Sequence, residues 1–315
     1  MKRYTGNDLR QLYEEAPREL RDRVSGTLER LPEEERQTLK PGKRYRVGLL
    51  AAVLVLVCLA TAAFATGTIH RWLHPYEYII LDNGSIEITK YNAGGGTVVI
   101  PEEIDGYAVT KIGERAFYQC HSIREAVIPE GVTDIGGMAF MECTAMESVT
   151  ISASVERIYS WAFCYCQNLK EIEIPESVEY IGRGVFASCS SLRSVRLPEK
   201  TPGIADELFT NCTALESVEM PDSVTAIGED AFSSCEALTG IRLPEGLTEI
   251  GRYAFGKCAA LKELVIPASV SEIDKYAFLG SENLRLIVTE GTYAAEFCRE
   301  NNLNYKTLPA IPAGK

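Results

Sequence analysis

Asn168-Leu-Lys-Glu-Ile-Glu-Ile-Pro-Glu-Ser-Val-Glu-Tyr-Ile-Gly-Arg-Gly-Val-Phe-Ala-Ser-Cys-Ser190 is one copy of a unit that the chain repeats every 23 residues. Cysteines keep this step from Cys120 to Cys258, and phenylalanines keep it from Phe117 to Phe278. A period that independent positions share over roughly 170 residues is typical of a stacked repeat protein. Because one unit cannot bury its apolar side alone, the units must stack into a solenoid with a continuous core.

The first part of each unit predicts a short strand, and the second part predicts a short helix. Ile172 and Ile174 share one face of the strand and alternate with glutamates, and Pro175 ends the strand because proline cannot donate to a ladder. The apolar residues from Val178 to Phe186 follow a spacing that suits one or two turns of α- or 3₁₀-helix. The predicted fold class is therefore α/β, a solenoid of 23-residue coils that each contain a short parallel strand and a short helical turn.

Both ends of the repeat depart from the pattern, as capping units must. The runs at 76–81 and 85–90 alternate around Asp82-Asn83-Gly84, which predicts a β-hairpin over the open first coil. The longer first unit contains an additional Asp105-Gly106-Tyr107, which we expect to form a loop. Residues 292–302 predict a closing helix, and a last strand follows at 304–308.

Four recurring motifs identify a family. They are Ile-Pro, Ile-Gly as in Ile181-Gly182, Ala-Phe, and Cys-x-x-Leu as in Cys189-Ser-Ser-Leu192. With these motifs, residues 76–308 resemble the BspA-like leucine-rich repeats of bacterial surface proteins. The resemblance implies a leucine-rich-repeat solenoid that acts as an adhesion or protein-binding module, and it supplies no shared ligand residues. One unit departs from the pattern at Lys200-Thr-Pro-Gly203, and we expect that coil to bulge outward.

A run without charge at 47–66 predicts a single transmembrane helix. Four basic residues crowd its N-terminal side between Lys40 and Arg46, so the positive-inside bias places the N-terminus in the cytoplasm and exports the repeats. Two alternatives stay open. The first is a cleaved signal peptide, because Ala63-Phe-Ala65 resembles a small-x-small cleavage site, and the second is a buried core helix.

The N-terminal head, residues 1–46, carries an apolar stripe at helical spacing from Leu9 to Leu31. It is too short for an independent core, so it is either a solvated juxtamembrane helix or a docking element for a cytoplasmic protein. Twelve basic and nine acidic residues lie in this head, which leaves twenty basic against thirty-five acidic residues after it. Such an acidic ectodomain repels phosphate, so we expect no nucleic-acid partner.

These interpretations give one predicted organisation. The boundaries are a cytoplasmic helical head and linker at 1–46, a membrane helix at 47–66, a juxtamembrane segment with the hairpin at 67–97, the solenoid at 98–290, and the C-terminal cap and tail at 291–315. The predicted location is a single-pass membrane protein with an extracellular repeat domain and contact with membrane lipid through residues 47–66.

The regular cysteines favour a structural role over catalysis. Stacked in register, their Cβ atoms would lie near 4.8 Å apart, which is wider than a disulfide requires, so buried free thiols are the favoured interpretation. A zinc site needs closer pairs, and neither a catalytic triad nor a phosphate loop can be assembled from the three histidines and Gly94-Gly-Gly96. We therefore expect no enzyme, no metal and no cofactor. The predicted cysteine ladder comprises Cys120, Cys143, Cys166, Cys189, Cys212, Cys235 and Cys258.

The outward side chains of the strands form the candidate interaction surface, because on a solenoid they line up coil after coil along the concave face. Their alternating charges are also consistent with a simple neutralising ladder of weak exposed pairs, and this interpretation stays open. The surface is nearly free of aromatic anchors, which favours weak multivalent contact with an extracellular protein or glycan. The candidate residues are Glu125, Thr150, Glu171, Glu173, Arg196, Glu219, Arg242 and Glu263.

Two functions remain after these exclusions. The first is adhesion or recognition at a bacterial cell surface by a membrane-anchored repeat protein. The alternative is a single-pass sensor, in which ligand contact outside the cell is signalled to a cytoplasmic partner through residues 1–46.

Overall fold

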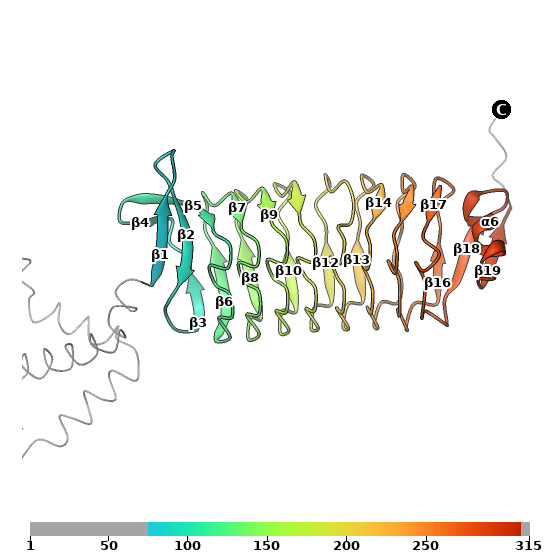
Figure 1. Ribbon diagram of the computed structural model, residues 1–315, viewed down its shortest axis with the longest axis horizontal. Helices are drawn as coiled ribbons and strands as arrows, with labels where there is room; N and C mark the ends of the chain where they lie inside the picture. The colour runs from blue at the N-terminus through green and yellow to red at the C-terminus, as the bar shows by residue number, and fades with distance from the viewer. Residues whose placement is uncertain (1–74, 310–315) are drawn as a thin grey trace, which may run out of the picture. The chain divides into compact units, whose positions relative to one another are not determined.

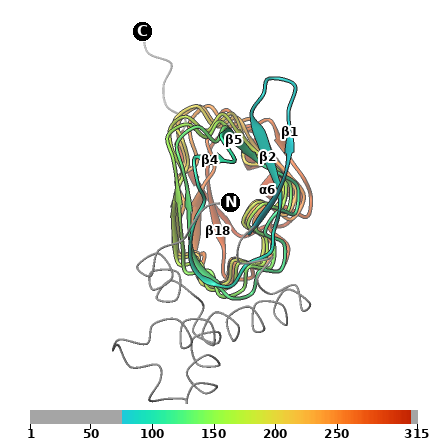
Figure 2. The same cartoon turned by 90° about the vertical axis from the view of Figure 1, so that its left-hand side faces the viewer.

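The computed structural model describes residues 75–309, which fold into a solenoid of about ten coils stacked in chain order (Figure 1). Viewed along the stack, successive coils follow nearly the same outline (Figure 2). The predicted head, membrane helix and juxtamembrane residues before 75, and the tail after 309, lie outside the described residues. Within 75–309, no helix has the length and apolar character that crossing a bilayer requires.

The longer strands of the coils form one side of the solenoid, in three separate three-stranded sheets whose repeat strands are parallel. Residues one period apart are paired, so that Ile172 pairs with Val195 and Val195 with Val218. These apolar side chains point inward and their charged neighbours point outward, as the alternation predicts. The strands are β3 (Gly96–Val99), β6 (Ile123–Ile128), β8 (Ser148–Ile151), β10 (Glu171–Glu173), β12 (Ser194–Arg196), β13 (Ser217–Glu219), β16 (Glu263–Val265), β18 (Arg285–Thr289) and β19 (Tyr305–Leu308).

A second column of strands, each of two residues, runs along another side of the coils. It corrects the prediction of a helix after Val178, because Tyr180–Ile181 pairs in parallel with Arg157–Ile158. One inward Ile or Leu per coil cannot distinguish a helical turn from a short strand at this length. The strands are β7 (Asp134–Ile135), β9 (Arg157–Ile158), β11 (Tyr180–Ile181), β14 (Ala226–Ile227), β15 (Glu249–Ile250) and β17 (Glu272–Ile273), after the longer β5 (Tyr107–Ile112).

The segment around each phenylalanine is a chain of turns, which we call the turn column. Trp161 and Tyr165, two residues before and after Phe163, both have positive φ, at 64° and 60°. Left-handed residues at these positions interrupt a right-handed helix. The Phe163 amide donates instead to the Val185 carbonyl of the next coil, at 3.0 Å. The predicted helical turn is therefore absent, and α6 (Tyr293–Glu300) is the single α-helix within residues 75–309.

A stack of aromatic rings fills the core beneath the turn column. The phenylalanines from Phe117 to Phe255 are fully buried, and neighbouring rings lie 4.7–6.2 Å apart with interplanar angles of 5–18°. Tyr91 of the N-terminal hairpin lies against Phe117 at 5.0 Å and closes this end of the stack. One continuous core therefore runs along the coils, as the repeat requires.

The caps agree with the predicted elements and correct one of them. β1 (Tyr76–Ile80) and β2 (Ile86–Tyr91) form the antiparallel hairpin, and α6 begins at the N-cap Thr292 before the last strand. The expected loop at 105–107 belongs to a second small hairpin, in which β4 (Glu103–Ile104) pairs with β5. Its turn contains Asp105 and Gly106, both at positive φ.

The irregular coil at residues 200–203 interrupts the second strand column and does not bulge outward. The backbone N–H groups of Glu179 and Thr225 each donate to a carbonyl of the preceding coil. Pro202 occupies the equivalent position in the coil between theirs. Proline has no N–H, so this rung is missing, and within residues 75–309 the second strand column has no strand in the coil between those of β11 and β14. Thr201 and Ile204 are nevertheless buried, and Ile204 still bridges to Ile227.

Candidate functional site

We define the strand face as the outward side chains of the longer-strand column. The structure places all eight candidate residues there, and all eight are exposed. Glu173, Arg196 and Glu219 follow one another in register across β10, β12 and β13. Glu171 lies in the adjacent row, which continues through Ser194 and Ser217. The inward isoleucines and valines fix this arrangement, because a shift of one residue would expose the core side chains.

Arg196 is the most connected charge on the strand face. Its Nη2 lies 3.4 Å from carboxylate oxygens of both Glu176 and Glu199, and its Nε lies 4.0 Å from Glu219. Glu176 and Glu199 follow the prolines that end the strands, so Arg196 reaches mainly along the edge of the face. All these side chains are more than half exposed, and such pairs contribute about 0–1 kcal/mol.

Arg242 does not continue a ladder with Glu219. Its Nη2 lies 3.1 Å from Asp222, which again lies just beyond a strand-ending proline. Apart from the 4.0 Å contact between Arg196 and Glu219, the alternating series that the sequence suggested is therefore replaced by local pairs to loop carboxylates. Because both arginines remain mostly solvated, an incoming ligand could exchange their partners at little cost.

Two further basic residues form ion pairs on the strand face but were absent from the sequence prediction. Lys170 Nζ lies 3.2 Å from Glu147, and Arg285 pairs with Glu263 across β16 and β18. Arg285 was missed because the last step of the repeat is 22 residues, which removes it from a strict period. One signal in the sequence could have found Arg285. It precedes the apolar Leu286, just as Glu263 precedes the apolar Leu264 in the strand before.

A depression of about 610 Å³ lies at the C-terminal part of the strand face. Its position coincides with the interruption of the longer-strand column near Gly240, because in the described residues this column has no strand in the coil between those of β13 and β16. Every lining residue carries an amide, hydroxyl or charged group, so the depression suits a ligand that forms hydrogen bonds. The lining residues are Thr239, Lys262, Glu263, Asn283, Arg285 and Asn304.

The cysteines of the ladder form hydrogen bonds instead of disulfides. The thiol of Cys189 donates to the carbonyl oxygen of Phe163 in the preceding coil at 3.2 Å, and the five other buried members repeat this bond at 3.1–3.2 Å. Cys120, in the first coil, is only half-buried. Burial raises the pKa of these thiols, to about 12 for Cys258. They are neutral structural groups rather than nucleophiles.

Asp134 is a buried carboxylate of the second strand column that pairs with the partly exposed Arg157. Arg157 donates to it from Nε at 2.6 Å and from Nη2 at 3.1 Å, and the hydroxyl of Thr133 donates at 2.7 Å. Burial by itself pushes the pKa of Asp134 upward, but these donors and the charges of Arg157 and Lys111 outweigh it and lower the pKa. Every bond is internal, so this cluster stabilises the coils. Among residues 75–309, no cluster of His, Cys, Asp or Glu has the arrangement of a metal site.

Comparison with known proteins identifies the repeat. Residues 98–216 and 203–309 match the model of the BspA type leucine rich repeat region, in six copies. A T. pallidum leucine rich repeat protein is 33% identical, with a TM-score of 0.58 over 59% of this chain and 88% of that chain. No curated protein matches the chain.

Two more distant structures share the fold. A leucine rich cell surface protein from Faecalibacterium prausnitzii is 24% identical, with a TM-score of 0.50 over 76% of this chain and 94% of that one. A leucine-rich repeat protein from Bacteroides ovatus is also 24% identical, with a TM-score of 0.53 over 77% of this chain and 79% of that one.

Proposed function

Because this chain belongs to the family of BspA-type leucine-rich repeat proteins, we propose that it is a membrane-anchored protein whose extracellular solenoid binds a protein or glycan at a bacterial cell surface. The observation that carries the proposal is the strand face. It presents exposed polar and charged side chains in register on a scaffold whose core is continuous. A surface of this kind positions many weak contacts without using binding energy to order the scaffold.

The polar hollow near Gly240 supports the choice of ligand class. It offers ammonium, guanidinium, carboxylate and amide groups together, while the strand face lacks the aromatic anchors of a tight protein interface. Sugar hydroxyls and polar peptide segments match such donors and acceptors. Affinity would then come from several copies of the ligand or of the receptor acting together.

The membrane anchor in this proposal rests on the sequence of residues 47–66 and its basic N-terminal flank. Protease treatment of intact cells tests the orientation. We expect the repeat region of the full-length chain to be digested from outside while an epitope tag at residue 1 survives. A repeat region that is degraded only after lysis would overturn the surface location.

The strand face is tested by binding of the full-length chain to host-glycan and surface-protein arrays. The double variant Arg196→Glu and Arg242→Glu reverses two solvated charges and should weaken the strongest array signal at least about tenfold. The matched control is Arg299→Glu on α6, because Arg299 is equally exposed but lies off the strand face. Equal loss in the control, or no loss in the double variant, would place the site elsewhere.

A sensor function is the second candidate, and the apolar stripe from Leu9 to Leu31 favours it. In a sensor, this stripe would bind a cytoplasmic regulator in response to ligand contact outside. Crosslinking from residues 1–46 of the full-length chain, with and without the array ligand, separates the two functions. A crosslinked partner that changes with ligand supports the sensor, and a head without ligand-dependent partners supports simple anchoring.

A further inference from the structure

The turn column has a direction. Every phenylalanine from Phe117 to Phe255 donates its backbone N–H to a carbonyl of the following coil, at 2.7–3.1 Å. The residue two positions later does the same, from Gln119 to Lys257, at 2.7–3.0 Å. From Arg115 to Asp230 the residue two positions before the phenylalanine donates in the same way, whereas the equivalent Tyr276 amide donates to the Asp274 carboxylate at 2.8 Å. Each coil therefore presents at least two parallel N–H donors, spaced by two residues, toward its C-terminal neighbour, and the neighbour supplies carbonyls with the same spacing.

The last coil presents the same donors without a coil to receive them. Phe278 and Gly280 occupy the two donor positions, and Gly280 keeps the left-handed conformation of its equivalents, with φ of 81°. Within the part of the chain that the structure describes, neither amide has an acceptor. A pair of backbone donors that ends a regular ladder is a binding element for another backbone, as at an open sheet edge.

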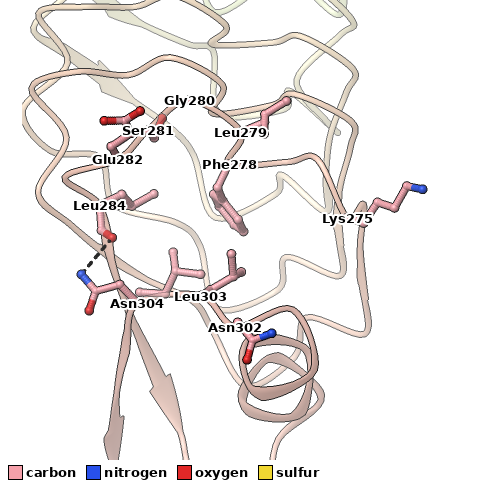
Figure 3. A pocket seen from close by; sticks show the side chains of 11 residues that line it. Lys275, Phe278, Leu279, Gly280, Ser281, Glu282, Leu284, Asn302, Leu303 and Asn304 are labelled. Carbon is pink, nitrogen blue, oxygen red and sulfur yellow. Dashed lines mark hydrogen bonds between the residues drawn. The ribbon is translucent and has the colours of Figure 1, made fainter.

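A cavity lies where the next coil would follow. It has a volume of about 260 Å³, and its walls include Phe278, Leu279, Leu284 and Leu303 (Figure 3). Phe278 is the last ring of the aromatic stack, 6.2 Å from Phe255, and unlike the rings before it Phe278 is only half-buried. The cavity is smaller than the pockets of about 300–1,000 Å³ that hold drug-sized ligands, so it suits one side chain of a longer partner.

The opposite end of the stack is closed, which decides between a second copy and a different partner. The Tyr91 amide donates to the Ala116 carbonyl at 2.7 Å, and the Tyr91 ring covers Phe117. Tyr76 packs against Tyr91 in turn, at 5.4 Å. The N-terminal end of another molecule therefore presents a finished cap, not an open coil that could continue the ladder.

We propose that the C-terminal end of the turn column binds a peptide segment of a partner protein that contains an aromatic residue. Two carbonyls of the peptide, spaced by two residues, accept from the amides of Phe278 and Gly280. The aromatic side chain enters the cavity and extends the ring stack beyond Phe278. The inference rests on the binding function proposed above, but it names a site separate from the strand face.

The test uses the full-length chain and a synthetic peptide that copies residues 228–235, the segment Gly-Glu-Asp-Ala-Phe-Ser-Ser-Cys, with serine for cysteine and both termini blocked. The control peptide has alanine in place of phenylalanine. We expect the phenylalanine peptide to bind at least about tenfold more tightly and to slow hydrogen exchange at residues 276–281. Equal binding of the two peptides, protection at another surface, or no binding at about 1 mM would overturn the proposal.

Variants of the chain locate the site. Leu279 is 56% exposed at the rim of the cavity, so Leu279→Asp should leave the melting temperature unchanged and lower peptide affinity at least about tenfold. Leu308→Asp, a similarly exposed leucine outside the cavity lining, is the control and should stay within about twofold. Self-association that Leu279→Asp abolishes would assign the cavity to a second copy and refute the proposal. If the double variant Arg196→Glu and Arg242→Glu loses array binding but the peptide does not bind the unsubstituted chain, the terminal site is refuted and the strand-face proposal stands.

Discussion

At the scale of single residues, the coils keep the same hydrogen bond at a given position even where the amino acid differs. The position of the ladder cysteines shows this, because Ser281 replaces cysteine in the last coil and keeps the role. Its hydroxyl donates to the Phe255 carbonyl at 2.6 Å and accepts from the Cys258 amide at 2.9 Å. A small donor that reaches the preceding coil is therefore what this position requires, and sulfur is one way to supply it.

Cys189→Ser and Cys189→Ala test that requirement. The serine keeps a donor for the Phe163 carbonyl, while the alanine removes it and leaves a void. We expect the serine variant to retain about 0.5–1.5 kcal/mol more stability than the alanine variant, measured by urea unfolding. The order is opposite to that expected for a purely apolar cavity. An alanine variant as stable as the serine variant would show that packing alone decides the position.

Asp134→Asn tests the ion pair between Asp134 and Arg157 as a function of pH. Near pH 7 we expect a loss of about 1–3 kcal/mol, because the donors of Arg157 lose a charged acceptor. The folded pKa of Asp134 is lowered, so its contribution is present above the unfolded value of about 4 and disappears as the pH falls through the folded value. The stability difference between wild type and variant should therefore shrink below about pH 4.

The control for this prediction is Glu156→Gln. Glu156 lies 3.2 Å from the same arginine but is half exposed, so its loss should change stability by less than about 0.5 kcal/mol. If the difference in stability between wild type and Asp134→Asn stays constant from neutral to acid pH, then the negative charge of Asp134 does not stabilise the fold.

At the scale of elements, the sequence predicted what depends on periodicity and missed what depends on backbone geometry. The strands of the strand face, the hairpin at 76–91 and helix α6 follow from alternation, turn residues and a capping threonine. The eight candidate residues fall on one surface for the same reason. The turn column did not follow, because residues such as Trp161 and Tyr165 at positive φ carry no signature in composition. The ion pairs of Arg196 and the terminal cavity depend on three-dimensional reach and were equally inaccessible.

Gly184 is the element-scale feature most open to test. It takes the left-handed position that Trp161 holds in the preceding coil, and a Cβ on Gly184 would lie 2.3 Å from the indole. Gly184→Ala should therefore cost about 1–3 kcal/mol through overpacking in addition to backbone strain. Adding Trp161→Ala should recover the steric part, which a double-mutant cycle of thermal melts measures.

Gly131→Ala separates strain from contact in this experiment. Gly131 also has a positive φ, of 93°, but its nearest neighbour would lie at 3.7 Å from an added Cβ. We expect Gly131→Ala to cost only about 1–2 kcal/mol. Purely additive losses for the Gly184 and Trp161 substitutions would rule out the proposed contact.

At the scale of the whole molecule, the buried thiols couple stability to alkaline pH along the entire solenoid. Burial raises the pKa of each of the six buried ladder cysteines. In the unfolded chain they ionise above about pH 8.5, while in the folded chain they stay neutral. Their contribution is therefore complete below about pH 8.5 and is lost as the pH rises toward the folded values.

We expect the urea midpoint to fall steeply between about pH 8.5 and about pH 9.5, with each thiol contributing up to about 1.4 kcal/mol per pH unit. Burial also raises the pKa of Cys120, Cys164 and Cys298. A variant with serine at Cys166, Cys189 and Cys212 should therefore show about two-thirds of the slope, because serine does not ionise in this range. If the urea midpoint falls equally steeply with pH in the two proteins, then groups other than these thiols cause the loss of stability at alkaline pH.

The directional donors of the turn column also bear on how such a gene changes length. Each interior coil accepts amide donors of the coil before it at its carbonyls and donates its own amides to the coil after it with the same spacing, so a coil copied in place meets compatible partners on both sides. Gain or loss of 23 codons inside the array therefore leaves both caps and every remaining rung intact. The length of the solenoid becomes a quantity that unequal recombination adjusts in whole steps, without any new side chain having to evolve.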